Sequence, residues 1–256
     1  MAEFFPVSAT ASKSDILSQL EGSKLIVPSI AIGNVPQLSA DLLLHNLGTK
    51  LIARLDSTLL YPFASPVDYV LDGSSKQTNE ISTGLELYFS DSTKIAVIQQ
   101  RSPILPGYAK NFLDYLVSFI EASKFTSVIV LDSNEAALRE DINIDRPLEL
   151  YSNNLTENFK SLKVTTSDSS DKLETSFTPF VSALVSELKR ATDLTVYALV
   201  IYVYEGDNTY DAQVLATETV GVLEVETPKE WKIPVSWSGA YGDRPLPSGL
   251  NEGIYG

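Results

Sequence analysis

The sequence contains no cysteine, a single histidine and a single methionine among its 256 residues. Without cysteine there can be no disulfide bond and no thiolate metal ligand, and a chain of this kind is typical of a reducing compartment. A Ser-His-Asp triad would have to use the one histidine, His45, and no G-x-S-x-G motif accompanies it. We therefore expect neither a bound metal nor another cofactor.

Basic residues and long apolar runs are also scarce. The chain has 19 Lys and Arg against 33 Asp and Glu, a net charge of -14. This charge argues against a nucleic-acid surface, which needs clustered cations, and it suits a basic protein partner or solubility. The longest apolar runs are strand-length, short of the ~20 residues of a membrane span, and residues 1–15 lack the pattern of a secretory signal. We expect a soluble intracellular protein that binds neither nucleic acid nor membranes.

Strands and helices alternate along the chain. Near-continuous apolar or β-prone runs predict strands, and apolar residues at i, i+3, i+4 and i+7 predict amphipathic helices. The strands are expected at 24–33, 50–55, 85–90, 94–100, 127–133 and 194–204. The helices are expected at 36–48, around 112–120, at 179–188 and at 210–223. This alternation predicts one α/β domain with a mostly parallel or mixed central sheet and helices on both faces.

The composition divides the chain into three parts. Residues 1–23 are expected to be an N-terminal extension, residues 24–237 the α/β domain, and residues 238–256 an extended C-terminal tail rich in Gly and Pro. Within the domain, the polar stretch 165–176 is typical of a flexible surface loop. The stretch 56–83 has no clear pattern.

A few residues could carry chemistry. Asp132 and Ser133 lie at the C-terminal end of a predicted strand, where ligands bind in open α/β sheets, and Arg101 follows another strand. Their convergence on a ligand would favour a small-molecule-binding enzyme of nucleoside-phosphorylase-like fold. The simpler interpretations are a turn-forming Asp132, a surface Arg101 and a structural or surface role for His45. There is no Walker A, G-x-G-x-x-G or H-E-x-x-H motif, so the residues by themselves support no enzyme.

Four segments carry recognisable motifs: VPSIAIGNVPQLSADLLL (27–44), KIAVIQQRSPI (94–104), YEGDN (204–208) and WKIPVSW (231–237). In this order they resemble the proteasome assembly chaperone 2 family, and the pair GN-x-x-QL and WKIP-x-SW is the most specific part. The resemblance implies an α/β/α sandwich and a non-enzymatic chaperone of the cytoplasm and nucleus. It also implies a heterodimer with proteasome assembly chaperone 1 that binds the outer face of the proteasome alpha ring. There it would guide ring assembly and prevent off-pathway association or premature regulator binding.

The last three residues, Ile254, Tyr255 and Gly256, match the hydrophobic–Tyr–any residue pattern of tails in this family. The resemblance implies that this tail enters a pocket between adjacent alpha subunits. Physically, the apolar residue and the aromatic ring bury area, and the phenol can form a hydrogen bond. A terminal carboxylate would be a fixed anion for a lysine in the pocket. The alternative is that Ile254 and Tyr255 pack against their own domain.

Overall fold

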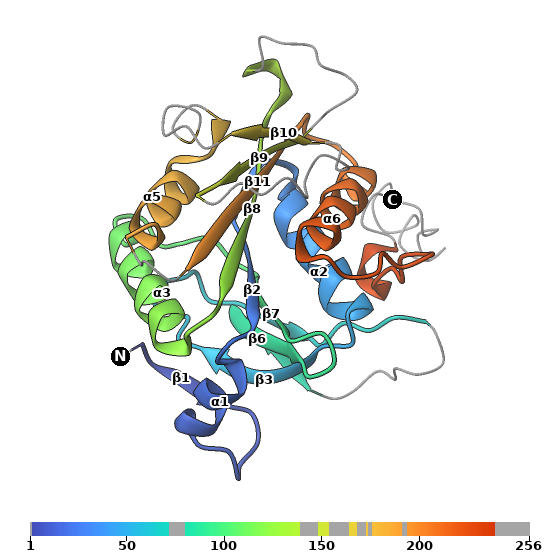
Figure 1. The fold of residues 1–256 in the computed structure, drawn as a ribbon. Coiled ribbons are helices and arrows are strands. Elements are labelled where there is room, and N and C mark those ends of the chain that lie inside the picture. Colours follow the sequence, from blue (N-terminus) through green and yellow to red (C-terminus); the bar gives the residue numbers. More distant parts are fainter. Residues whose placement is uncertain are drawn as a thin grey trace, which may run out of the picture.

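The structure is a computed structural model that describes residues 2–71, 80–138, 148–153, 164–167, 173, 176–190 and 194–238. These residues form three layers, a central sheet with helices on both faces (Figure 1). The expected α/β/α sandwich is therefore confirmed. None of the described helices is both long and apolar enough to cross a lipid bilayer.

The main sheet is mixed. Over the described residues its strand order is β1-β3-β6-β7-β2-β8-β11-β9-β10, and β7-β2-β8-β11 is its parallel centre. The pairs β1-β3, β3-β6, β6-β7 and β11-β9 are antiparallel. Central strands are apolar along their length because helices cover both faces. The strands are β1 (Phe4–Pro6), β2 (Lys24–Pro28), β3 (Lys50–Leu55), β6 (Leu85–Ser90), β7 (Ile95–Gln100), β8 (Ser127–Glu135), β9 (Leu148–Ser152), β10 (Val164–Ser167) and β11 (Thr195–Val203), with β4 (Ala64–Pro66) and β5 (Ile81–Thr83) forming a separate pair.

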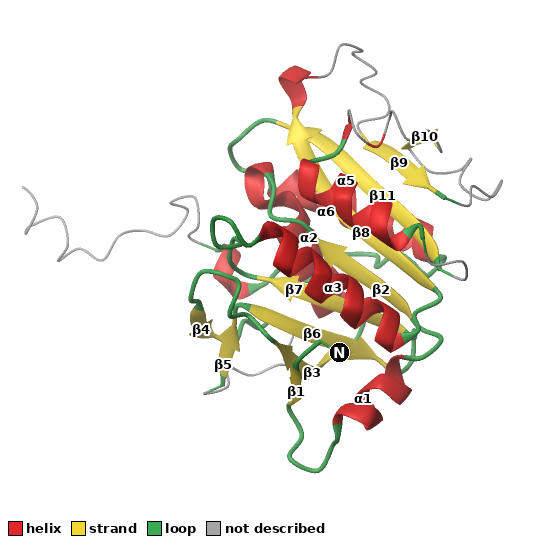
Figure 2. Ribbon diagram, turned by 90° about the vertical axis from the view of Figure 1, so that its left-hand side faces the viewer, coloured by secondary structure: helices red, strands yellow, loops and turns green. Residues whose placement is uncertain are grey.

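The helices form one layer on each face of the sheet. Helices α3 (Ala109–Ser123) and α5 (Pro179–Leu188) cover one face, with α1 (Lys13–Leu20) beside α3 (Figure 2). Helices α2 (Val35–Asn46) and α6 (Thr209–Leu223) cover the other face and contact each other. The short helices η1 (Ile32–Asn34), η2 (Ala136–Leu138) and η4 (Val235–Trp237) lie in connections. The four helices expected from the sequence are all present.

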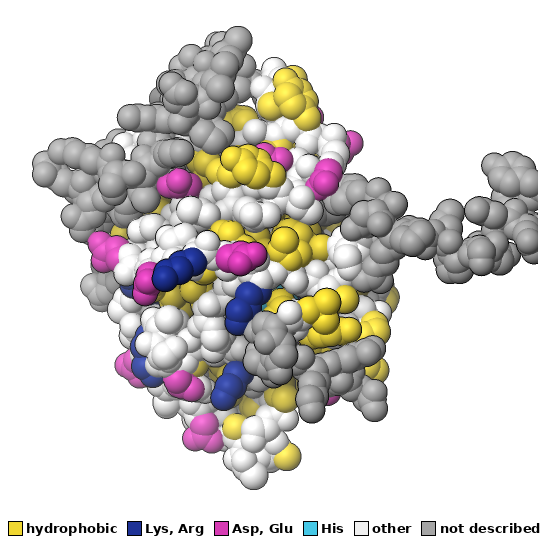
Figure 3. Space-filling model, turned by 90° about the vertical axis from the view of Figure 1, so that its right-hand side faces the viewer, with side chains coloured by type: hydrophobic (Ala, Val, Ile, Leu, Met, Phe, Trp, Pro, Cys, Tyr) yellow, Lys and Arg dark blue, Asp and Glu magenta, His cyan; other side chains and the backbone are white. Residues whose placement is uncertain are grey.

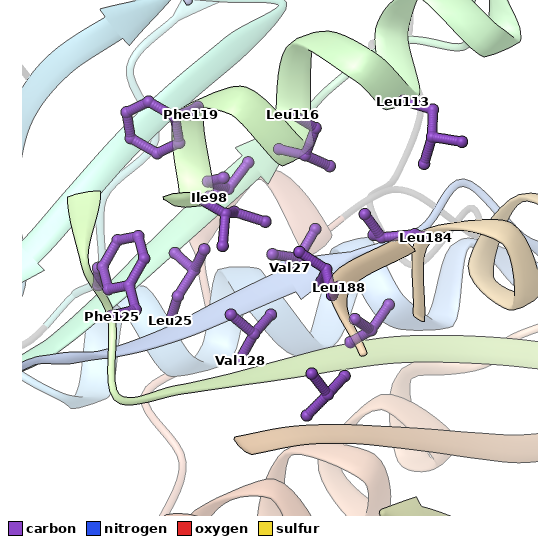
Figure 4. Close-up of a cluster of buried hydrophobic side chains, with 14 of the residues drawn as sticks. Leu25, Val27, Ile98, Leu113, Leu116, Phe119, Phe125, Val128, Leu184 and Leu188 are labelled. Carbon is purple, nitrogen blue, oxygen red and sulfur yellow. The ribbon is translucent and has the colours of Figure 1, made fainter. Parts of the chain in front are cut away.

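Two apolar cores hold the layers together. In the first, side chains of α3 and α5 face Leu25, Val27 and Val128 of the central strands (Figure 4). The second lies between the sheet and the α2–α6 layer, and there Ile129 of β8 is fully buried. Burial of apolar area is the main stabilising term in such a fold, at about 25 cal/mol per Å².

Residues 2–23 lie inside this architecture, whereas the sequence indicated an extension. Strand β1 pairs with β3, and Phe4 and Leu20 are buried in the first core. A capping box between Ser12 and Asp15 begins α1. The described residues of the stretch 165–176 also differ from the expected surface loop, because β10 contains three of them and Leu173 is buried. Residues 239–256, most of the expected tail, lie outside the described residues.

Candidate functional site

Asp132 and Ser133 do not converge on one ligand site. They are consecutive on β8, and successive side chains of a strand point to opposite faces. The carboxylate of Asp132 accepts hydrogen bonds from Ser29 Oγ and from the backbone N–H of Thr178, both at 2.7 Å. Ser133 Oγ instead donates to the carbonyl of Ile32 at 2.7 Å. Each side chain therefore fixes a loop to the sheet.

Asp132 has a raised pKa, as many functional carboxyl groups have, but its hydrogen-bond partners indicate a structural role. Burial raises its pKa to about 6, although hydrogen bonds from Thr178, Ser29 and Ser133 lower it in part. A perturbed pKa can mark a functional site. Here both carboxylate oxygens are used within the fold, where they join β8 to the end of β2 and to the start of α5.

Arg101 forms a buried ion pair, so it is neither an anion contact nor the surface charge that the sequence favoured. Its guanidinium donates from Nη1 to Oδ2 of Asp41 on α2 at 2.8 Å, and Nη2 forms an ion pair with Oδ1 of the same carboxylate at 2.8 Å. Gln99 Nε2 donates to the same carboxylate at 2.7 Å. Burial is the largest single influence and lowers the pKa of Arg101. The charge and hydrogen bond of Asp41, with the charges of Tyr88 and Glu86, together raise it by more, so the net shift is upward and Arg101 stays charged. The pair links α2 to the end of β7.

His45 does not complete a catalytic set. It lies half-buried in the last turn of α2, whereas the Asp132 carboxylate is bound by Ser29 and Thr178. No cluster of three or more His, Asp or Glu side chains that could hold a metal ion occurs in the described parts of the chain. The enzyme alternative therefore lacks a converging set of residues in the part of the chain that the structure describes.

The motif segments meet around α2 instead. Gly33 and Asn34 make a left-handed turn, with φ of 65° and 53°, directly before α2. Asn208, from the YEGDN segment, packs against Gly33 so closely that a Cβ at Gly33 would lie 2.7 Å from Asn208 Cγ. One turn further on, Ser39 Oγ donates to the carbonyl of Ala212 on α6 at 3.0 Å. The turns before α2 and α6 are thus locked together.

The WKIPVSW segment docks on the outside of the same two helices. Asn46 of α2 exchanges two hydrogen bonds with the backbone of Lys232, at 2.9 and 3.1 Å. Trp231 Nε1 donates to Thr217 Oγ1 of α6 at 3.3 Å. The backbone N–H of Val235 then donates to the carbonyl of Tyr69 at 2.9 Å. These contacts fix the path of the chain up to Ser238, the last described residue.

A cavity of about 420 Å³ lies where the described chain ends. Its walls come from the start of α6, from Leu71 and from the WKIPVSW segment, and Ser238 is one of them. Figure 3 views the side of the molecule that carries α2 and α6, and it shows hydrophobic side chains exposed in several groups among charged ones. The cavity is lined by Leu71, Asp207, Thr209, Gln213, Ile233, Pro234, Val235, Trp237 and Ser238.

The sequence did not reveal the contacts that hold these motifs together. Asp41 was counted among the residues of an apolar helix, and its partner Arg101 lies 60 positions away. Nothing local to either residue indicates such a pair. The predicted docking residues Ile254, Tyr255 and Gly256 lie outside the described residues.

The fold shows which class of protein this is. It is an α/β/α protein in which motif segments form the α2–α6 layer and the WKIPVSW segment packs on the outside of that layer. Within that class, residues 25–230 match the model of the PAC2 family, and the chain belongs to that family. The resemblance found in the sequence is thereby confirmed.

Relatives named proteasome assembly chaperone 2 match over most of their length. The protein of Danio rerio is 28% identical over 252 residues, covering 90% of this chain and 96% of its own. The Saccharomyces cerevisiae protein is 26% identical, covering 86% of this chain and 95% of its own. The Homo sapiens protein is 26% identical, covering 87% and 93%.

Solved structures share the fold. Pyrococcus furiosus PbaA, described as an archaeal homolog of proteasome-assembly chaperone, superposes with a TM-score of 0.59 at 19% identity, covering 82% of this chain and 84% of its own. Pyrococcus furiosus PbaB, described as an archaeal proteasome activator, superposes with a TM-score of 0.58 at 13% identity, covering 89% and 92%. At these identities the likeness supports the fold alone.

Proposed function

We propose that this protein is a proteasome assembly chaperone subunit of the cytoplasm and nucleus. It forms a heterodimer with proteasome assembly chaperone 1 and docks on the outer face of the 20S proteasome alpha ring. Docking promotes assembly of the ring and prevents off-pathway association or premature binding of regulators. The observation that carries the proposal is membership of the PAC2 family, with relatives of one name matched along almost their whole length.

The tail Ile254-Tyr255-Gly256 is the proposed contact with a pocket between alpha subunits. Ser238, the first residue of the proposed tail, is exposed on the outer side of the α2–α6 layer, and this position supports the proposed role. The tail thus begins at the molecular surface. Where Gly256 ends the chain, its carboxylate can pair with a cation in the pocket, and the glycine adds no side chain to obstruct it.

No enzymatic activity is part of the proposal. Asp132, Ser133 and Arg101 are used in separate structural contacts, and His45 joins none of these contacts. We expect His45→Ala and Asp132→Asn to leave alpha-ring binding unchanged, provided that each variant still melts cooperatively. Loss of ring binding in a well-folded His45→Ala variant would reopen the enzyme alternative.

Two measurements test the proposal. The first is mass spectrometry of proteins that co-purify with an N-terminally tagged chain, which should recover proteasome alpha subunits and proteasome assembly chaperone 1. The second is alpha-ring binding by a protein extended by one residue after Gly256. The extension removes no side chain but shifts the carboxylate by up to about 3.6 Å. Unchanged binding at matched salt would rule out the tail contact, and absence of alpha subunits from the purified material would rule out the function.

A further inference from the structure

Two large apolar side chains that line the cavity at the start of α6 are exposed. Leu71 is 84% exposed and Ile233 is 48% exposed. Apolar side chains grouped around a hollow mark contact sites, whereas single exposed ones do not. The volume of about 420 Å³ lies in the range of cavities that hold a small organic group. We call this cavity the α6 hollow.

The walls of the α6 hollow combine apolar and polar groups. Leu71, Ile233 and Trp237 contribute apolar surface, whereas the loop before α6 and the start of the helix contribute Asp207 and Thr209. An aromatic ring that carries a hydroxyl group suits such walls, because the ring buries apolar area and the hydroxyl group can form a hydrogen bond. The α6 hollow therefore favours a tyrosine side chain over a purely aliphatic one.

One residue in the wall of the α6 hollow has a hydrogen-bond donor without a partner. Trp237 lines the hollow, and its Nε1–H is buried and has no acceptor in the described part of the chain. Buried donors in folded proteins almost always have an acceptor, and an unpaired one is destabilising. A carbonyl group from the chain that follows Ser238 would supply this acceptor.

The described chain ends in the wall of the α6 hollow. Ser238 lines it, and residues 239–256 follow. Tyr241 is the first large side chain after Ser238, and three residues span at most about 11 Å, so Tyr241 stays close to the hollow in any conformation. Arg244 is the only basic residue of 239–256 and lies within about 22 Å of Ser238. Its charge is opposite to that of Asp207 in the wall.

We propose that the chain after Ser238 folds back on the domain and places the side chain of Tyr241 in the α6 hollow. There the ring covers Leu71 and Ile233, and Arg244 lies on the side of Asp207. This docking does not require the proteasome. One consequence of it rests on the proposed function: the part of the tail that extends from the domain is shortened, and a shorter linker raises the effective concentration of the last three residues at a pocket within reach.

The test compares two tyrosines of the intact chain that have nearly the same neighbours. Tyr241 lies in the sequence Gly-Ala-Tyr-Gly and Tyr255 in the sequence Gly-Ile-Tyr-Gly, so Tyr255→Ala is the matched control for Tyr241→Ala. We expect Tyr241→Ala to lower the melting temperature by roughly 2–6 °C, because the ring no longer buries apolar area, and Tyr255→Ala to leave it unchanged. Tyr241→Phe keeps the ring and should lower the melting temperature much less.

A double-mutant cycle shows whether the α6 hollow receives the ring. Leu71→Ala alone should also lower the melting temperature, because the proposed docking covers a side chain that is 84% exposed in the described structure. In the Leu71→Ala background, Tyr241→Ala should have a much smaller effect than in the parent, since substitutions of residues in contact are not additive. Hydrogen exchange is a second measurement, and the amides of residues 240–244 should exchange more slowly than those of residues 248–256.

Three outcomes overturn the inference. The first is that Tyr241→Ala melts like the parent, or that its effect is the same with and without Leu71→Ala. The second is a fall in melting temperature with Tyr255→Ala in place of Tyr241→Ala, which assigns the α6 hollow to the end of the tail. The third is that the effect of Tyr241→Ala disappears on dilution, which assigns the hollow to a second copy of the chain. None of these measurements uses the alpha ring, so the proposed function is tested separately by ring binding.

Discussion

The side chain of Asn208 packs against Gly33, although the two residues lie in turns that precede different helices. A Cβ at position 33 would come within 2.7 Å of Asn208 Cγ, and Gly33 has a φ of 65°. Asn208 Nδ2 also donates to the carbonyl of Tyr204 and to Asp211, at 2.9 Å each. Position 33 therefore requires glycine, because of its backbone conformation and because a side chain has no space there. The contact holds the turn before α2 against the turn before α6.

Gly33→Ala should destabilise the fold more than the same substitution at a glycine that has the same φ. Gly48 has the same φ of 65°, but no atom lies within 4 Å of a Cβ built there. Gly48→Ala should cost about 1–2 kcal/mol for the left-handed conformation, which lowers the melting temperature by roughly 2–8 °C in a domain of this size. Gly33→Ala should lower it clearly further, because Asn208 must also move. Equal shifts in a thermal melt would mean that the contact with Asn208 is unimportant.

Replacing only one partner of the Asp41–Arg101 ion pair should lower the free energy of unfolding strongly. Arg101→Gln leaves the carboxylate of Asp41, which is 5% exposed, without its cation. Removing one partner of a buried pair typically costs about 3–5 kcal/mol of unfolding free energy. The double variant Asp41→Asn with Arg101→Gln should recover part of this loss, since no buried charge remains.

The control for that experiment is the exposed pair of Lys110 and Asp114 on α3, at 2.9 Å. Lys110→Gln should change the urea midpoint very little, because solvent screens exposed pairs. A small effect of Arg101→Gln, similar to that of Lys110→Gln, would show that the pair does not hold α2 to β7.

Asp132 should make stability fall as the pH rises through the mildly acidic range. Its pKa is raised from 3.8 to about 6 in the fold, so between these values the folded state holds a proton that the unfolded state has lost. The stabilisation from the neutral carboxyl is complete below pH 3.8 and is lost as the pH passes about 6. A shift of this size corresponds to roughly 3 kcal/mol.

Asp132→Asn should flatten this part of the stability profile between pH 4 and 7, measured by urea unfolding at each pH. The amide can still accept from one partner, so the variant should fold. A profile as steep as that of the parent would assign the pH dependence to other groups.

The sequence predicted best those elements whose determinants are local. Strands β3 and β6 have the predicted bounds, and α2 begins and ends at the predicted turns, because apolar runs and Gly or Pro signals are contained in a few residues. Strand β1 and the short strand β10 were missed, since each depends on pairing with a distant strand. Short edge strands carry little pattern of their own.

For the candidate site as well, local features could be predicted from the sequence and long-range contacts could not. The motif segments were found from the sequence, but their meeting around α2 was not, because contacts such as Asn46 with Lys232 join residues 186 positions apart. Asp132 and Ser133 were expected at a strand end, but β8 continues to Glu135, and the alternation of strand side chains sends the two residues to opposite faces. A strand end expected from the sequence therefore does not by itself define a ligand site.

The tail should depend more on the aromatic ring of Tyr255 than on its hydroxyl group. Tyr255→Ala removes a ring worth about 1.5–3 kcal/mol when fully buried, so the tail contact should weaken by roughly ten- to a hundredfold. Tyr255→Phe keeps the ring and loses one hydrogen bond, which is worth about 1 kcal/mol, so its effect should be several times smaller. The measurement is the dissociation constant for alpha rings at matched salt, with both variants melting like the parent. The contacts of the partner subunit would reduce the loss in total affinity, so a tail peptide ending at Gly256 should be measured as well. If Tyr255→Ala lowers the melting temperature and leaves ring binding unchanged, Tyr255 packs against its own domain, as the alternative holds.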